Sequence, residues 1–252
     1  FASAFREALI AEGVPVAGDA IDIDDFISKP DRAGGRTLVA HQSPPLRQLV
    51  SSMMKVSQNQ YAEILLKTIG AADAAGATGS TSAMGAMGAT GAMGATGAMG
   101  VRRVRDVLRG WDIPEDSHVM TDGSGLSRYN FVTSDALVRI LQVMRNDPVH
   151  ASPFLESLPV AGRTGTLSSR LSGTAAEGRV RAKTGTVDNV RAIAGYVETA
   201  DGETLVFSMI ANNFTVPNGA VDAAADKALV RLATFSTRSQ TADAASVGRV
   251  SR

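Results

Sequence analysis

The last third of the chain contains three short segments in which apolar and polar residues alternate, the pattern of half-buried β-strands. These segments cover residues 179–183, 190–198 and 205–211. Asp201-Gly202 lies between the last two, and this dipeptide favours the tight turn of a β-hairpin. Strands joined this closely pair in antiparallel fashion, so the sequence predicts a small antiparallel sheet near the C-terminus.

Helical patterns precede these strands, and one follows them. In each, apolar residues recur at intervals of three and four, which places them on one face of a helix. The helical stretches are residues 1–9, 46–54, 62–69, 101–108, 137–144 and 221–232. We expect Ser43-Pro44-Pro45 to begin one helix and Thr133 to cap another, with Gly13, Gly70 and Gly110 ending three of them. The apolar stripe of 46–54 is expected to be buried. Helices packed on an antiparallel sheet form an α/β fold of the α+β type.

Residues 71–100 are of low complexity. From Ala83 to Gly100 the chain consists of six triplets, each Ala, then Met or Thr, then Gly. Glycine this frequent opposes both helix and strand, and the segment has no proline to support a collagen-like triple helix. We therefore predict that 71–100 is an insertion forming a mobile surface loop, with a methionine-rich contact surface as the alternative. The polar tail, 236–252, is expected to be disordered.

The composition excludes several classes of function. Lysine plus arginine number 25, as do aspartate plus glutamate, so a nucleic-acid partner is not expected. The absence of cysteine excludes disulfides and thiolate metal sites, and no apolar run is long enough to span a bilayer. The chain begins at Phe1, already within a helical pattern. We interpret it as the later part of a longer protein, whose signal peptide, if it had one, would lie upstream.

Lys183-Thr184-Gly185-Thr186 follows the alternating residues 179–182 and would end a strand. A lysine there attracts a substrate carboxylate and favours the deprotonated form of nearby groups. The threonine hydroxyls can donate to the same carboxylate, and the glycine lets an extended peptide approach the strand. A backbone N–H just past the glycine could stabilise an oxyanion by about 3 kcal/mol. A hairpin with a surface lysine is the alternative.

Ser57-Gln58-Asn59 lies between two helical patterns. Ser57 could relay a proton, and Asn59 offers a donor and an acceptor to a substrate peptide bond. Capping of the following helix is the simpler interpretation. Together, S-x-N and K-T-G are two of the three signatures of penicillin-interacting serine acyl-transferases; the third, S-x-x-K, carries the nucleophile.

Ser52-Met53-Met54-Lys55 matches S-x-x-K. On a helix Ser52 and Lys55 would share a face, but this face lies opposite the apolar stripe and points away from the core. It is also almost adjacent to S-x-N, whereas the two motifs must reach a reacting carbonyl from different walls of a cleft. Ser52 and Lys55 are therefore only an alternative nucleophile pair. Arg163-Thr164-Gly165-Thr166 imitates K-T-G, but no strand-like alternation leads into it.

Other chemistries find less support. The three histidines, at 41, 118 and 150, are scattered and lack metal-ligand spacing, so neither a metal nor a cofactor is expected. The sequence has no G-x-S-x-G elbow and no nucleotide-binding glycine loop.

Taken together, the motifs resemble those of the D-alanyl-D-alanine carboxypeptidase/endopeptidases, the low-molecular-mass class C penicillin-binding proteins. The matching strings occur in the family's order and cover most of residues 1–235. They are Ser43-Pro44-Pro45-Leu46, Ser57-Gln58-Asn59-Gln60-Tyr61-Ala62-Glu63, Asp122-Gly123-Ser124-Gly125-Leu126-Ser127-Arg128, Leu158-Pro159-Val160-Ala161-Gly162, Gly165-Thr166-Leu167 and Ala182-Lys183-Thr184-Gly185-Thr186.

The resemblance implies a penicillin-binding/β-lactamase-like transpeptidase fold over 1–235, incomplete at its N-terminus. It implies a serine D,D-peptidase that acts on peptidoglycan stem peptides in the periplasm or elsewhere outside the cytoplasmic membrane, and that β-lactams acylate. The implied catalytic residues are Ser57, Asn59 and Lys183. The implied substrate-binding residues are Thr184, Gly185 and Thr186, whose N–H would help hold the oxyanion, with Leu126 and Arg128 bordering the pocket.

In this family the nucleophile's motif comes early, which implies that the serine and its lysine lie upstream of Phe1. An acyl transfer needs a nucleophile with an adjacent base, so we expect this chain to be inactive alone and its intact parent to be an enzyme. The alternatives are a non-catalytic peptidoglycan- or β-lactam-binding module, or a β-lactamase or esterase of the same fold. The sequence gives no indication of oligomeric state.

Overall fold

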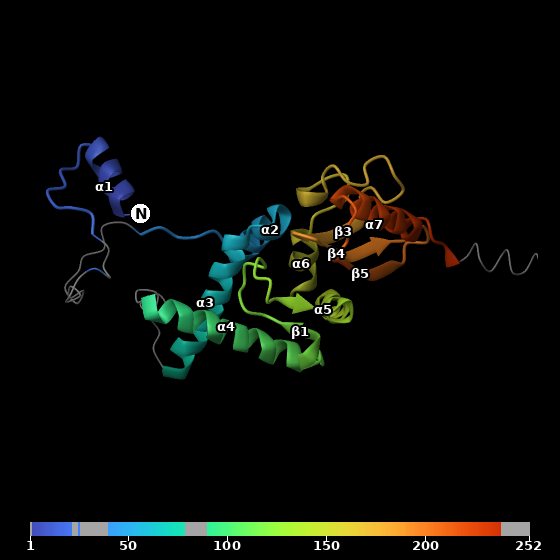
Figure 1. The fold of residues 1–252 in the computed structure, drawn as a ribbon, viewed down its shortest axis with the longest axis horizontal. Helices are drawn as coiled ribbons and strands as arrows, with labels where there is room; N and C mark the ends of the chain where they lie inside the picture. Colours follow the sequence, from blue (N-terminus) through green and yellow to red (C-terminus); the bar gives the residue numbers. More distant parts are fainter. Residues whose placement is uncertain (1, 22–24, 26–39, 79–89, 238–252) are drawn as a thin grey trace, which may run out of the picture.

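The computed structural model describes residues 2–21, 25, 40–78 and 90–237. The helices and strands, in chain order, are α1 (Ala2–Ala11), α2 (Leu46–Val56), α3 (Asn59–Thr78), α4 (Thr90–Gly110), the 3₁₀ turn η3 (Glu115–Ser117), β1 (His118–Val119), β2 (Phe131–Val132), α5 (Ser134–Asn146), α6 (Ala151–Ser157), the 3₁₀ turn η4 (Gly165–Leu167), β3 (Val180–Val187), β4 (Val190–Glu198), β5 (Thr204–Asn212) and α7 (Asn218–Ala233). Figure 1 shows α1 apart from the body formed by the other elements.

The predicted antiparallel sheet is present, with strand order β3-β4-β5. Val187 pairs with Val190 at one tight turn, and Glu198 pairs with Thr204 at the other. Gly202 adopts a φ of 80° in the second turn, a conformation that glycine reaches without steric cost. β3 extends beyond its predicted end at 183 and includes all of Lys183-Thr184-Gly185-Thr186. Among the described strands, β3 forms one edge of this sheet.

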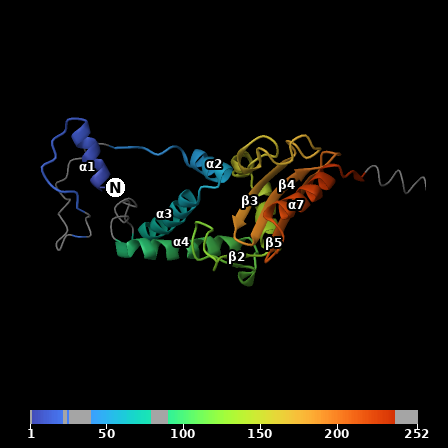
Figure 2. The ribbon, with the colours of Figure 1, turned by 45° about the horizontal axis from the view of Figure 1, so that its top comes forward.

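Helices cover both faces of the sheet, as the alternation along β4 requires. On one face Val197 packs in a cluster with Leu229 and Ala233 of α7. On the other face Tyr196 packs against Leu141 of α5 and Leu158, with Met54 of α2 beside them. The hydroxyl of Tyr196 donates a 2.6 Å hydrogen bond to the carbonyl of Leu141, which ties α5 to the sheet. Figure 2 shows α7 lying along one side of β4 and β5. The predicted fold class is therefore observed.

The loop prediction for residues 71–100 is wrong at both ends. Residues 71–78 continue α3, and residues 90–100 begin α4; residues 79–89 lie outside the described part. The reason is close helix packing. A Cβ at Gly70 would collide with the backbone of Thr96, and one at Gly100 would collide with the carbonyl of Leu66. Glycine costs up to about 1 kcal/mol in a helix, but here it lets two backbones approach, and the packing outweighs propensity.

Several predicted helix boundaries also need correction. Gly70 does not end a helix, because it serves this close contact within α3. Gly110 ends α4 and Thr133 caps α5 by accepting from the Ala136 N–H, both as predicted. At α2 the capping residue is Pro45, without a side-chain cap, rather than Ser43. No residue of α2 is fully buried, and Leu46 is 63% exposed, so its apolar stripe covers the body only in part.

The tail predicted to be disordered falls largely on residues 238–252, outside the described part. Ser236 and Thr237 are described, and both bind the carboxylate of Asp201. Among the described helices, none is both long enough and apolar enough to cross a membrane.

Candidate functional site

Ser57 stands at a sharp break between α2 and α3. Its φ and ψ of 59° and 54° are left-handed, and the N–H of Gln58 bonds back to the carbonyl of Met53 at 3.0 Å. This is the bond that closes a helix with a left-handed terminal residue, a place normally taken by glycine. A serine there costs roughly 1–2 kcal/mol in backbone strain. α2 therefore ends before Ser57. In a continued helix the Ser57 hydroxyl would lie on the same side as the apolar stripe of α2, and the break turns it away from that position.

Lys183 of β3 reaches this break. Its Nζ donates to Ser57 Oγ at 2.7 Å and to the carbonyl of Thr184 at 2.7 Å. Ser57 and Lys183 are 126 positions apart in the chain, so the fold joins the S-x-N and K-T-G strings. Lys183 lies on the sheet face that α2 and α5 cover, because its pairing partner on β4 is Ala194. Burial lowers the pKa of the Lys183 ammonium below its ordinary value of 10.5.

Asn59, the first residue of α3, connects the break to a loop that contains residues 122–128. Its Nδ2 donates to the carbonyl of Ser124 at 2.6 Å. One helical turn later, Glu63 Oε2 accepts from the N–H of Gly123 at 2.7 Å. Gly123 has no room for a side chain, since a Cβ there would press on the backbone of Ala62. α3 therefore holds this loop against the S-x-N string at two successive positions.

The loop is also stabilised from within by Asp122. Its carboxylate accepts from Ser124 Oγ at 2.7 Å and from Asn130 Nδ2 at 2.7 Å. Burial opposes ionisation of Asp122, but these bonds and others from the backbone of Gly125 and Ser127 outweigh it and hold its pKa below the ordinary value. At the tip, Leu126 is 59% exposed, and Arg128 forms a 3.5 Å ion pair with Asp188 in the β3–β4 turn. The loop tip therefore lies beside the end of β3.

The two threonines of K-T-G-T project from the sheet face opposite to Lys183. Thr184 Oγ1 donates to Thr166 Oγ1 at 2.8 Å, and Thr186 Oγ1 accepts from Arg191 Nη1 at 2.6 Å. Thr166 belongs to the R-T-G-T string that sequence reasoning dismissed. Gly165 in this string has a φ of 63° and packs against the backbone of Lys55. The missed signal was that glycine: it allows η4 to sit on the end of α2.

Ser52 and Lys55 do not form a pair. Ser52 is exposed, whereas Lys55 turns inward and donates to the carbonyl of Leu158 and to Thr164 Oγ1, the latter at 3.2 Å. Burial, then the charge of Arg181, lowers the pKa of Lys55. The prediction that this face points away from the core is therefore wrong for Lys55, because the α6–η4 segment packs on α2 and receives its ammonium.

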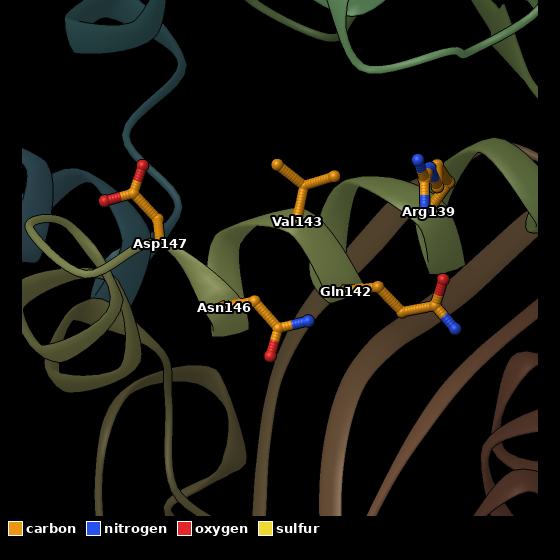
Figure 3. A pocket seen from close by; sticks show the side chains of 5 residues that line it. All are labelled: Arg139, Gln142, Val143, Asn146 and Asp147. Atoms are coloured by element: carbon orange, nitrogen blue, oxygen red, sulfur yellow. The ribbon is translucent and has the colours of Figure 1, made fainter.

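A hollow lies away from this site, and the described residues offer no metal-binding cluster. The hollow, of about 470 Å³, lies along α5 and includes none of the predicted site residues. Its lining side chains, drawn in Figure 3, are Arg139, Gln142, Val143, Asn146 and Asp147. Among the described residues, no group of three or more His, Cys, Asp or Glu side chains is arranged to hold a metal ion. The site is thus built from hydroxyls, an amide, a lysine and a strand edge, a set suited to binding an extended peptide and moving protons.

This architecture is that of the penicillin-binding proteins. The crystal structure of penicillin binding protein 4 (dacB) from Haemophilus influenzae, complexed with a β-lactam, matches with a TM-score of 0.62 at 26% identity. The match covers 77% of this chain and 43% of that one. The fold predicted from the sequence is confirmed.

The chain belongs to the D-Ala-D-Ala carboxypeptidase 3 (S13) family, whose model matches residues 1–235. The D-alanyl-D-alanine carboxypeptidase of Actinomadura sp. (strain R39) is 37% identical over 236 residues, which are 92% of this chain and 39% of that protein. Carboxypeptidase DacB of Mycolicibacterium smegmatis is 35% identical over 199 residues, covering 76% of this chain and 39% of that protein. The chain thus spans about two fifths of the length of these relatives, and the family resemblance is confirmed.

Proposed function

We propose that this chain supplies part of the active site of a serine-type D-Ala-D-Ala carboxypeptidase/endopeptidase. The enzyme acts on peptidoglycan stem peptides outside the cytoplasmic membrane and is acylated by β-lactams. The observation that carries the proposal is the 2.7 Å hydrogen bond from Lys183 Nζ to Ser57 Oγ. It joins two motifs that have a shared chemical purpose and are far apart in sequence. The carboxypeptidase relatives and the β-lactam bound to the structural neighbour support the same assignment.

Ser57 and Lys183 form the proton-transfer part of this proposal. An ammonium has only donors, so Ser57 Oγ accepts from Lys183, and its own hydrogen is free to point towards a bound substrate. Such a hydroxyl can pass a proton to the leaving amine while Lys183 supplies positive charge beside it. Asn59, held by Ser124, would bind the substrate's peptide bond through its remaining amide atoms. The left-handed backbone at Ser57 is in keeping with strain stored at a functional site.

The edge of β3 forms the peptide-binding part. Val160 already bridges the start of this edge at Arg181. A D-Ala-terminated peptide would lie along the remaining part as an added strand, with its carboxylate at Thr184 and Thr186. At Gly185 a Cβ would meet only the Cβ of Ala192, at an ordinary 3.5 Å. The chain's own packing therefore does not require glycine there, which supports a requirement set by the substrate. Leu126 and Arg128 would border the far end, and the Thr186 N–H would hold the oxyanion.

The nucleophile in this proposal is not Ser52. Its hydroxyl is exposed, and its presumed lysine partner is engaged with Leu158 and Thr164 instead. In keeping with the family resemblance, we propose that the nucleophilic serine and its base come from outside residues 1–252.

The test uses the full-length product of the gene that encodes this chain, with release of D-alanine from a stem-peptide analogue as the measurement. We expect Lys183→Ala and Ser57→Ala each to lower kcat/KM by at least ~100-fold, equivalent to about 2.7 kcal/mol of transition-state stabilisation. Ser52→Ala should retain the wild-type rate. Full activity of Lys183→Ala, or loss of activity in Ser52→Ala, would overturn the proposal.

A labelling experiment separates the proposal from its rivals. A fluorescent penicillin should acylate the full-length gene product at a serine outside residues 1–252, and this adduct should hydrolyse only slowly. Intact-mass measurement and peptide mapping would show the adduct and its position. The chain 1–252 alone should remain unlabelled. Rapid turnover of the penicillin without D-alanine release would favour a β-lactamase, and an adduct on Ser52 would contradict the assignment of roles.

A further inference from the structure

Arg191 contacts Thr186, one of the two threonines proposed to bind the substrate carboxylate. It lies on β4 directly opposite Thr186 of β3, and side chains opposite one another on antiparallel strands project from the same face. Its Nη1 donates to Thr186 Oγ1 at 2.6 Å. Neither the sequence motifs nor the family resemblance drew attention to it.

The guanidinium of Arg191 is held in place from α7. Its Nη2 donates to Asp222 Oδ2 at 2.5 Å, and Asp222 also lies 3.5 Å from Arg170, which bonds to Asp226 at 2.6 Å. These four side chains are only 20–26% exposed. Arg191 Nε is buried and has no hydrogen-bond partner in the described structure.

This contact fixes the role of the Thr186 hydroxyl. A guanidinium carries donors only, so Thr186 Oγ1 must accept from it. The threonine's own hydrogen then has to point elsewhere, and Thr186 is exposed at the end of the edge strand. Thr184 differs, because its partner is another hydroxyl and the direction of that bond can reverse.

We propose that Arg191 is a positioning residue that makes Thr186 an obligate hydrogen-bond donor to the terminal carboxylate of the substrate. The inference rests on the proposed function and deepens it. Arg191 acts through Thr186 and confers preference for a free carboxylate over an uncharged C-terminus. Asp222 holds the guanidinium at the angle that this requires.

The test compares two stem-peptide analogues that differ only at the C-terminus, a D-Ala-D-Ala carboxylate and its carboxamide, with the full-length gene product. Arg191→Gln should lower the kcat/KM ratio of carboxylate to carboxamide about tenfold, mainly through KM for the carboxylate. Thr186→Val should do the same, and the double variant should lose no more than either single variant. Arg191→Lys should restore part of the preference. Arg231→Gln, at an exposed arginine of α7, is the matched control and should leave the ratio unchanged.

The possible failures are distinguishable. Suppose that the wild-type protein prefers the carboxylate peptide and that Arg191→Gln lowers kcat/KM equally for the carboxylate and the carboxamide. The arginine then has only a structural role, and the inference is wrong. Additive losses in the double variant would also overturn it, because Arg191 would not act through Thr186. A wild-type protein that neither cleaves nor binds either analogue would overturn the proposed function, and this inference with it.

Discussion

At the residue scale, Ser57 and Lys183 occupy energetically unfavourable positions that the surrounding packing maintains. Ser57 occupies a left-handed backbone conformation, and Lys183 carries its ammonium into a partly buried place where charge is disfavoured. The sequence showed the chemical types at 57, 59 and 183 and allowed their convergence to be predicted from the motifs. It assigned no role to Thr166 or Arg191: Thr166 lies in a string that matches the family without a predicted role, and Arg191 belongs to no motif. Their roles depend on strand register and on η4 packing against α2.

Glycine at position 57 should separate backbone strain from function. Ser57→Gly relieves the left-handed strain, so its free energy of unfolding should exceed that of Ser57→Ala by about 1 kcal/mol, while neither retains the proposed proton relay. Urea denaturation of the chain measures this difference. An alanine variant as stable as the glycine variant would show that the left-handed conformation of this residue is not maintained in solution.

The pH dependence of acylation should reflect Lys183. Burial disfavours its charged form, so the ammonium loses its proton at a lower pH than an exposed lysine. In the full-length gene product we expect the acylation rate with penicillin to fall on the alkaline side with an apparent pKa below 10.5. Lys183→Arg should be slower but should hold its rate to higher pH, because a guanidinium stays protonated. An unchanged alkaline limb in this variant would assign the limb to another group.

At the element scale, the sheet and most helices follow from periodicity, and the failed prediction for residues 71–100 has one cause. The alternating pattern located β4 correctly from Val190 to Glu198. Successive side chains of this strand point to opposite faces of the sheet, and helices cover both faces. The glycine-rich segment misled the prediction, because glycine was judged on its propensity alone. In α3 and α4 its lack of a side chain is what lets the two helices approach, a tertiary effect that local sequence does not contain.

Three glycines in these helices provide a matched comparison. Gly70→Ala and Gly100→Ala should each destabilise the chain by about 1–3 kcal/mol, because the added methyl group meets backbone of the facing helix. Gly97→Ala lies in α4 with no atom within 4 Å of the new Cβ, so it should be neutral or stabilise by up to about 1 kcal/mol. Thermal unfolding of the three variants gives the order. Equal effects at all three positions would mean that the close contact between α3 and α4 is absent in solution.

At the scale of the whole molecule, the sheet brings together groups from distant parts of the chain. β3 presents Lys183 to the α2–α3 break on one face and the threonines to η4 and Arg191 on the other. A ligand at the edge of β3 could therefore be contacted from both faces. The motifs predicted that these groups meet, but only the packing of α2 against α6 and η4 shows how the α2–α3 break is held beside β3.

The central claim is that Ser57 and Lys183, which are joined by a hydrogen bond, act as one unit. The most direct measurement is a double-mutant cycle on the rate of penicillin acylation in the full-length gene product, using Ser57→Ala, Lys183→Met and the pair. We predict that each single variant is slowed at least ~100-fold and that the double variant is hardly slower than the worse single one. Losses that multiply independently, or a Lys183→Met variant that acylates at the wild-type rate, would contradict it.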